Sequence, residues 1–256
     1  MEIVILPSAA DVDAAAADIV ASLVLKRPDV VLGVATGSSP QGIYRQLAAR
    51  VADGAVSFAG ASAFALDEYV GLDVGHPESY HSVIAREVCG PLGFDQVRVR
   101  VPDGSAADTT KAATAYETAI ADAGGIDLQI LGIGTNGHIG FNEPTSSLAS
   151  RTRVKTLAPQ TRADNARFFA DPADVPTHCI TQGLGTIFEA RHLLLVAQGA
   201  SKSDAIAHAV EGPVSSRWPG SILQLHPHAT VILDEAAASR LELADYYRYA
   251  VANKPA

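Results

Sequence analysis

Short runs of valine, isoleucine and leucine alternate with longer alanine-rich stretches along nearly the whole chain. The short runs have the composition of buried β-strands, and the longer stretches have the apolar spacing of amphipathic helices. We expect strands at residues 2–6, 30–35, 62–66, 97–101, 126–133, 192–197 and 229–233. We expect helices at residues 9–26, 40–53, 79–89, 108–123, 159–169, 200–211 and 235–250.

This order of elements predicts an α/β fold with three layers, in which helices cover both faces of an open, mostly parallel, Rossmann-like sheet. The chain has 256 residues, of which 48% are hydrophobic, so we expect one domain over residues 1–256. No apolar run reaches the roughly 18 residues that a membrane helix needs, and the first residues lack the pattern of a signal peptide. We therefore expect a cytoplasmic protein.

Charge and cysteine usage exclude several kinds of site. The formal net charge of −9 argues against a nucleic-acid partner, and an anionic substrate would need local cations. Cys89 and Cys179 lie far apart without a Cys-x-x-Cys spacing, so neither a disulfide framework nor a zinc site is expected.

The densest chemistry lies in residues 132–144, directly after the strand expected at 126–133. His138 and Glu143 stand five residues apart there, at a strand end where open α/β sheets gather their ligands. A lone histidine in an apolar context is more often structural. The neighbouring Gly137 and Gly140, which let backbone approach a ligand, and a nearby carboxylate favour a functional histidine.

Two further strand ends carry candidate chemistry. The strand at 30–35 runs into Thr36, Gly37, Ser38 and Ser39, a small-residue turn before a helix that could seat a phosphate or simply be a tight turn. The strand at 62–66 runs into Asp67 and Glu68, which could be a surface turn or a desolvated carboxylate pair of raised basicity. Nearby, Tyr80 could line a pocket, whereas His76 and His81 are expected to be structural or exposed.

Together these segments resemble the glucosamine-6-phosphate deaminase family, which shares the phosphate turn, the Asp-Glu-Tyr strand end and the Gly-His-Ile-x-Phe-Asn-Glu-Pro loop. The resemblance runs through residues 35–40, 66–71, 76–80, 132–157, 167–169, 199–202 and 223–227. It implies aldose–ketose isomerisation and hydrolytic deamination of D-glucosamine 6-phosphate to fructose 6-phosphate and ammonia, without metal or organic cofactor.

The resemblance also implies roles for individual residues. Asp67 would move the proton between carbons 2 and 1, and His138, oriented by Glu143, would open the sugar ring. Some family members have aspartate where this chain has Asn136; an amide can hold the imidazole but supplies no charge. The implied substrate-binding residues are Thr36, Gly37, Ser38, Ser39, Tyr80, Gly137, Arg167 and Lys202. Residues 159–173 resemble a mobile lid.

A regulatory site and an assembly are also suggested by the resemblance. Oligomeric relatives bind the activator N-acetylglucosamine 6-phosphate between subunits, and the matching residues here are Ser146, Ser147, Arg153 and Lys155. Residues 151, 153 and 155 alternate along a strand-like run, so their side chains should share one face, which is more commonly just solvated. A homo-oligomer and allosteric activation are therefore candidate properties.

Two other functions remain open. A 6-phosphogluconolactonase would share the general fold and a Gly-His loop, but its pattern there runs toward Thr-Ala-Ser-Leu-Phe-Pro. Sugar-phosphate-sensing regulators use similar ligand domains behind a helix-turn-helix module, whereas this chain enters its first strand at Glu2. Ammonia release, lactone hydrolysis and DNA binding would separate the three.

Overall fold

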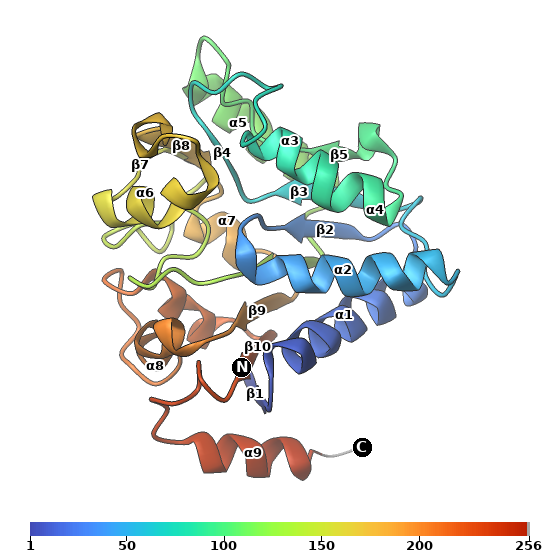
Figure 1. Ribbon diagram of the computed structural model, residues 1–256, viewed down its shortest axis with the longest axis vertical. Helices are drawn as coiled ribbons and strands as arrows, with labels where there is room; N and C mark the ends of the chain where they lie inside the picture. Colours follow the sequence, from blue (N-terminus) through green and yellow to red (C-terminus); the bar gives the residue numbers. More distant parts are fainter. Residues whose placement is uncertain (255–256) are drawn as a thin grey trace.

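A computed structural model of the chain describes residues 1–254 and contains a central seven-stranded sheet (Figure 1). Every paired strand in this sheet runs parallel to its neighbour. Its order is β1 (Glu2–Leu6), β10 (Ala229–Asp234), β9 (Leu193–Ala197), β6 (Leu128–Leu131), β2 (Val31–Val34), β3 (Ser62–Ala65) and β5 (Val99–Arg100). The chain moves outward from β2 to β5, then returns beside β2 with β6 and moves outward the other way. The switch point of the sheet therefore lies between β2 and β6.

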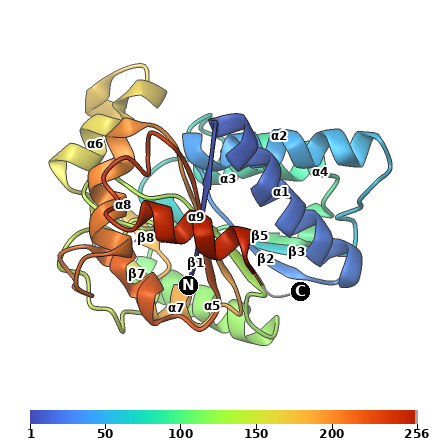
Figure 2. The same cartoon turned by 90° about the horizontal axis from the view of Figure 1, so that it is seen from below.

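Helices cover both faces of this sheet, which confirms the predicted three-layer α/β fold (Figure 2). One core packs Leu32, Ile130 and Val196 against α1 (Ala9–Lys26), α2 (Ser38–Ala52) and α4 (Gly90–Leu92). The other core packs alternate sheet residues, such as Leu131 and Leu195, against α5 (Thr109–Asp122), α7 (Leu184–Phe188) and α8 (Ser203–Val210). The alternation follows from side chains pointing to opposite faces along a strand.

A second, three-stranded antiparallel sheet lies beside the carboxyl end of β3. It consists of β4 (Asp67–Tyr69), β8 (His178–Thr181) and β7 (Arg153–Thr156), in that order. Only β7 was expected as strand-like, because β4 and β8 are short and fully paired inside the molecule. Next to this sheet lie α6 (Pro159–Asn165) and the single-turn helices η3 (Ala166–Phe168) and η4 (Pro172–Asp174).

Several expected elements differ in detail. The segment 79–89 is divided into α3 (Tyr80–Ile84) and a π-helical turn η1 (Ala85–Cys89), because Pro91 in α4 lacks the N–H that an uninterrupted α-helix would use. The strand expected at 97–101 is reduced to β5, since residues 96–98 form the turn η2 (Gln96–Arg98) capped by Asp95.

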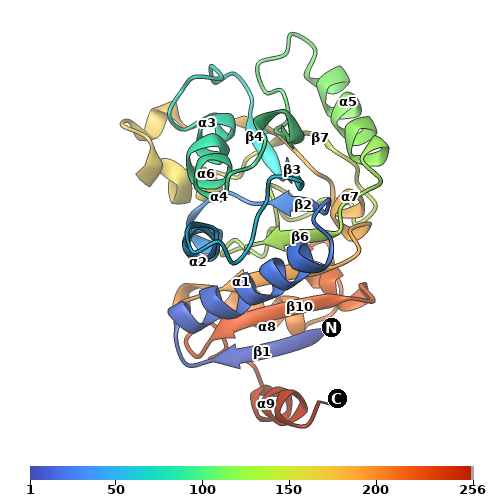
Figure 3. The same ribbon diagram turned by 90° about the vertical axis from the view of Figure 1, so that its right-hand side faces the viewer.

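The helix expected at 235–250 was wrong in its first half. Residues 235–243 form turns, and α9 spans Ala244–Ala252. The Asp234 carboxylate accepts hydrogen bonds from the amides of Gly199 and Ala237, which fixes a turn where alanine-rich composition suggested a helix. Helix α9 packs along β1 at the outer edge of the sheet (Figure 3).

The remaining short helices are η5 (Ala200–Lys202), which leads into α8, and η6 (Pro219–Leu225). Within residues 1–254, none of the helices combines the length and the apolarity that crossing a membrane requires. The organisation of the chain as a single domain stays a prediction.

Candidate active site

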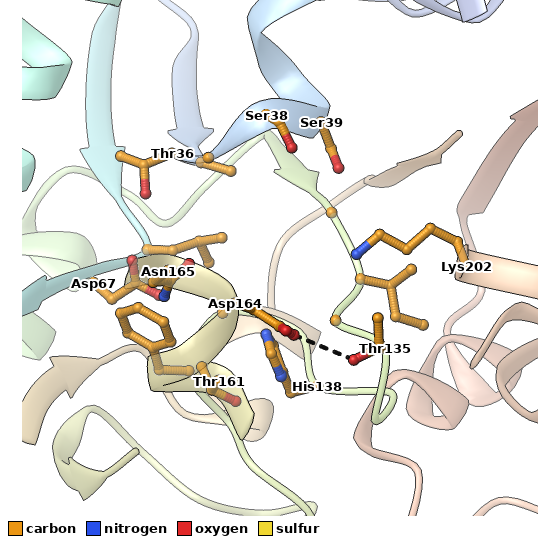
Figure 4. Close-up of a pocket in the computed structure, with 18 of the residues that line it drawn as sticks. Thr36, Ser38, Ser39, Asp67, Thr135, His138, Thr161, Asp164, Asn165 and Lys202 are labelled. Atoms are coloured by element: carbon orange, nitrogen blue, oxygen red, sulfur yellow. Dashed lines mark hydrogen bonds between the residues drawn. The ribbon is translucent and has the colours of Figure 1, made fainter. Parts of the chain in front are cut away.

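A cavity of about 480 Å³ opens at the carboxyl ends of β2, β3, β6 and β9, at the switch point of the sheet (Figure 4). Its walls also include α3 and α6, so segments far apart in the sequence meet there. The lining residues are Ala35, Thr36, Gly37, Ser38, Ser39, Leu66, Asp67, Tyr80, Gly132, Ile133, Gly134, Thr135, His138, Gly140, Phe141, Thr161, Asp164, Asn165, Arg167, Gln198, Ser201 and Lys202. Asp67 and His138 thus face one shared cavity, as the sequence interpretation requires.

The turn after β2 presents the open end of a helix to this cavity. Gly37 has φ 87°, a left-handed conformation that glycine adopts readily, and α2 begins directly after it. Because no side chain caps α2, the first-turn amides are free to bind an anion. Ser38 and Ser39 point their hydroxyls toward the cavity (Figure 4).

Two cations stand at the same end of the cavity. Lys202 lies where η5 meets α8, and burial lowers the pKa of its ammonium while Asp164 opposes that shift. Arg167 comes from η3, is exposed, and donates a hydrogen bond from Nη2 to Ser38 Oγ at 3.3 Å. Because the chain has a net charge of −9, a phosphate needs local positive charge, and Lys202 and Arg167 can supply it here.

His138 is held by an amide that a carboxylate in turn fixes. Its Nδ1 lies 2.7 Å from Asn136 Oδ1, while Asn136 Nδ2 donates to Glu143 Oε2 at 2.8 Å. Glu143 Oε2 lies 3.8 Å from His138 Nδ1, so Glu143 acts on the histidine through Asn136. The other carboxylate oxygen of Glu143 accepts from the Ala158 amide at 2.9 Å.

This chain of bonds determines which imidazole nitrogen carries the proton. Because Glu143 can only accept, Asn136 must present its NH₂ to Glu143 and its oxygen to His138. A neutral His138 therefore carries its proton on Nδ1, and Nε2 is left as the basic nitrogen. Burial lowers the pKa of His138, whereas the negative charge of Glu143 opposes the shift.

Asp67 is the most perturbed carboxylate of the cavity. It is the first residue of β4, lies opposite Thr181 of β8, and is only 5% exposed. Burial, with a further contribution from the charge of Glu68, raises its pKa to about 8, against the opposing effects of the Phe141 amide and the Thr181 hydroxyl. An ionised Asp67 is consequently a much stronger base than an ordinary aspartate.

Glu68 has a structural role despite being adjacent. Its carboxylate accepts hydrogen bonds from the amides of Tyr69, Tyr80 and His81 at 2.8–2.9 Å, and so binds the first turn of α3. This anchoring places Tyr80 against the cavity, where its ring packs on Tyr69 at 4.8 Å between centroids.

Gly137 was expected to contact substrate but does not line the cavity. It has φ 84°, and a Cβ there would lie 2.5 Å from Trp218 Cε3, so its smallness serves packing. Gly134 makes room for the catalytic candidate, because a Cβ there would lie 2.1 Å from His138 Cε1. Gly140 does line the cavity, and a Cβ at this position would lie 3.5 Å from Asp67 Oδ2.

The residues expected at a regulatory phosphate site differ in their contacts within the single chain. Arg153 donates to Asn142 Oδ1 at 2.8 Å, and Ser146 is buried. The Ser147 hydroxyl accepts from the Ala149 amide, and Lys155 lies on β7 opposite Cys179. Arg151, expected on the same face, instead pairs with Glu117 and Glu189.

Sequence reasoning missed a polar wall contributed by α6. Thr161, Asp164 and Asn165 line the cavity from one face of that helix, and Thr135 lies opposite on the loop after β6 (Figure 4). The spacing of these positions, i, i+3 and i+4, was the available signal for a shared face. Among residues 1–254, no group of three or more histidine, cysteine, aspartate or glutamate side chains is arranged to hold a metal ion.

Comparison with known proteins identifies close relatives. The family model described as glucosamine-6-phosphate isomerases/6-phosphogluconolactonase matches residues 8–232. A glucosamine-6-phosphate deaminase of Beutenbergia cavernae is 60% identical over 256 residues, which cover 100% of this chain and 98% of that protein. One of Mycolicibacterium smegmatis is 58% identical with the same coverage.

Solved structures agree. A monomeric glucosamine-6-phosphate deaminase superposes with a TM-score of 0.92 at 39% identity, covering 94% of this chain and 100% of that one. A 6-phosphogluconolactonase from Trypanosoma cruzi superposes with a TM-score of 0.76 at 19% identity, covering 94% and 97%, which shows a shared fold.

Proposed function

Since the chain belongs to the glucosamine-6-phosphate isomerase and 6-phosphogluconolactonase family, we propose that the cavity around Asp67, His138 and Lys202 is the active site of a deaminase. The reaction is the isomerisation and hydrolytic deamination of D-glucosamine 6-phosphate to fructose 6-phosphate and ammonia, the activity of the full-length relatives at 56–60% identity. The observation that carries the assignment of the site is the meeting of a buried carboxylate, an oriented imidazole and a phosphate seat in one cavity.

The phosphate of the substrate would bind at the open end of α2. The amides and hydroxyls of Ser38 and Ser39 offer donors, and Lys202 and Arg167 supply positive charge. This arrangement fixes one end of the sugar, so that the reacting carbons are held at the other end of the cavity. Thr36, Gly37 and Tyr80 contribute to the wall beside it.

Ring opening is assigned to His138. Its Nε2 takes the proton of the anomeric hydroxyl and delivers it to the ring oxygen, as the bond between carbon 1 and that oxygen breaks and the aldehyde forms. The other proton stays on Nδ1 of the ring and is donated to Asn136 Oδ1, and Asn136 together with Glu143 keeps the ring in the required tautomer. A neutral imidazole at neutral pH is favoured by its burial.

Proton transfer between carbons 2 and 1 is assigned to Asp67. The ionised carboxylate removes the proton from carbon 2, and the bonding electrons form the double bond between carbons 1 and 2. The aldehyde oxygen takes up a proton from the ammonium group on carbon 2, which becomes the amine of the enolamine. Asp67 then returns its proton to carbon 1, leaving an iminium group at carbon 2. Water adds to that carbon and ammonia leaves, which gives the ketone of fructose 6-phosphate.

Segment 159–173 would act as a lid over these steps. Helix α6 forms one wall of the cavity, and Arg167 at its end reaches Ser38 across the opening. Closure would exclude water from the enol until it is protonated. The site as a whole is assigned no metal and no organic cofactor, because each step is a proton transfer or the addition of water.

Ammonia release tests the function directly. Purified protein should release ammonia and fructose 6-phosphate in equal amounts from glucosamine 6-phosphate and should show no comparable hydrolysis of 6-phosphogluconolactone. Lactone hydrolysis without ammonia release would favour the rival enzyme, for which the similarity here is one of fold.

Regulation, assembly and location form a separate part of the proposal. We infer from the sequence that N-acetylglucosamine 6-phosphate activates a homo-oligomer through Ser146, Ser147, Arg153 and Lys155, in the cytoplasm. A relative that shares the fold at 39% identity is described as monomeric. Light scattering with and without the activator, paired with initial rates, tests this part independently: a monomer with unchanged rates would contradict it.

A further inference from the structure

Asp164 places a carboxylate inside the cavity that none of the proposed chemical steps uses. Its Oδ2 accepts a hydrogen bond from Thr135 Oγ1 at 3.3 Å (Figure 4). Its Oδ1 accepts one from Gln160 Nε2 at 2.8 Å. The carboxylate is therefore held between α6 and the loop after β6, facing the cavity. Thr135 and Gln160 both act as donors to this carboxylate.

The charge of Asp164 acts on the cations of the phosphate seat. Lys202 lines the same cavity, and although burial lowers the pKa of this lysine, the negative charge of Asp164 works against that shift. Arg167, three residues after Asp164 in the sequence, has a positive charge that lowers the pKa of Lys202. Asp164 is thus the carboxylate that favours the charged state of Lys202.

A phosphate dianion would meet this carboxylate when it binds. The same charge that favours the protonated form of Lys202 repels a second anion brought beside it. The Asp164 carboxylate and the phosphate would compete for the positive charges of Lys202 and Arg167. Inside the cavity, solvent ions screen the repulsion between the two anions less than they would at an exposed surface.

We propose that Asp164 is a resting counter-ion of the phosphate seat, which balances Lys202 and Arg167 in the free protein and weakens the binding of every phosphate ligand. The inference rests on the proposed function only in taking this end of the cavity as the place where phosphate binds. Asp164 is a positioning residue in this role and touches no reacting atom. Its charge also opposes the lowering of the His138 pKa, so its effect on the phosphate seat is read from binding, where it reduces affinity for the phosphorylated substrate and product alike.

The variant Asp164→Asn tests the charge while keeping the shape of the side chain. Asparagine retains an oxygen that can accept from Thr135, so the contact between α6 and the loop can persist. We expect the dissociation constant of inorganic phosphate, measured by calorimetry, to fall about 3- to 10-fold. The KM for glucosamine 6-phosphate should fall by a similar factor, with kcat changing less than KM.

Two matched variants separate charge from structure. Asp174→Asn makes the same change of net charge in the nearby turn η4, where Asp174 is exposed and does not line the cavity. The phosphate affinity of this variant should therefore equal that of the parent protein. Thr135→Val removes the hydrogen bond and leaves the charge, so it should not tighten binding. High salt should shrink the difference between Asp164→Asn and the parent protein.

Unchanged or weaker phosphate binding in Asp164→Asn would overturn the inference. Equal tightening in Thr135→Val would also overturn it, because the bond and not the charge would then be responsible. Failure of the proposed function is recognised separately, since phosphate binding is measured without turnover. A protein that binds phosphate as described but releases no ammonia would contradict the function alone.

Discussion

Asp67 shows how the surroundings of one carboxylate determine its strength as a base. Asp67 needs low polarity around it to become a strong base, yet the same burial opposes its ionisation and raises its pKa to about 8. The sequence pointed to Asp67 through its place after an apolar run. Its partner Thr181 could not be found that way, because 113 residues of the chain lie between the two, which meet only when β4 pairs with β8.

Replacing Asp67 should stop the transfer of the carbon 2 proton. Asp67→Asn has nearly the same shape but cannot accept that proton, so we expect kcat to fall roughly 10²- to 10⁴-fold. In the parent protein, kcat/KM should rise with pH through about 8, since the raised pKa means that the carboxylate is the minority form below it. Exchange of the carbon 2 hydrogen with deuterated solvent measures the step, and parental exchange in Asp67→Asn would remove the assignment.

The link between His138 and Glu143 gives a second residue-level prediction. Asn136→Ala takes away the acceptor of the Nδ1 proton and also frees a carboxylate oxygen of Glu143. The ring would lose its fixed tautomer, and we expect kcat/KM for cyclic glucosamine 6-phosphate to fall about 10- to 100-fold. Inhibition by inorganic phosphate is the control, because Asn136 lies away from the phosphate seat and the inhibition constant should not change. A parental kcat/KM would show that the amide is dispensable.

Other residues of the site show where sequence reasoning stops. His138 and the residues of the turn at 36–39 lie in glycine- and hydroxyl-rich segments after apolar strands, which predicted a ligand site. All of them line the cavity. Gly137 was misjudged because its glycine requirement comes from Trp218, a contact between distant parts of the chain. Asp164 was missed because a charged residue on a helix is usually solvated, and only the packing of α6 over the sheet reveals that it faces inward.

At the scale of elements, long periodic patterns were predictable and short paired strands were not. Both β1 and α1 have the expected boundaries, since each is set by its own apolar spacing and, for α1, by the cap Ser8. The strands β4 and β8 are stabilised by pairing with each other and not by local preference. Because β4 carries Asp67, the part of the fold that the sequence specifies least clearly also holds a central functional group.

The junction between β4 and α3 gives a prediction at this scale. Glu68 binds three amides at the start of α3, and its charge contributes to the raised pKa of Asp67. Glu68→Gln should weaken the helix start and lower the free energy of unfolding by about 1 kcal/mol. It should also lower the pKa of Asp67, because a repelling charge is removed, and so shift the rise of kcat/KM to lower pH.

Chemical denaturation and a pH–rate profile check these two effects separately. Glu78→Gln is a suitable control, since it makes the same change in the loop before α3 without any of the three amide contacts. The interpretation of Glu68 would be contradicted by a kcat/KM profile that keeps its position on the pH axis.

At the scale of the whole molecule, opposite ends of the sheet carry different chemistry. The carboxyl ends of the strands gather the cavity and its cations, although the net charge of the chain is −9. Near the amino ends of β9 and β10, His192 and His228 stack with ring centroids 3.8 Å apart. The stacked rings lie at the opposite end of the strands from the cavity, so protonation of His192 should affect folding and not catalysis.

Acid sensitivity of the fold should depend on that stacked pair. Burial lowers the pKa of His192 to about 4, with further contributions from the charges of His228 and His226, whereas an unfolded chain would protonate it near 6.5. Between these values the unfolded state binds more protons, so stability is present above pH 6.5 and is lost as the pH falls toward 4. Asp67 has the opposite effect on stability, because its pKa is raised and its contribution grows as the pH falls. The effect of His192 must therefore be measured as a difference from the parent protein.

His192→Gln should therefore flatten the acid side of the stability curve. Glutamine cannot take up a proton and can still pair with the Thr230 hydroxyl that His192 contacts at 2.9 Å. We expect the loss of unfolding free energy between pH 7 and pH 5 to be smaller by about 1 kcal/mol than in the parent, after allowance for the partial exposure of the ring. His178→Gln, at an exposed position at the start of β8, should leave the curve unchanged. If urea denaturation gave parallel curves for His192→Gln and the parent, the stacked pair would have no part in acid unfolding, and the carboxylates would have to account for it.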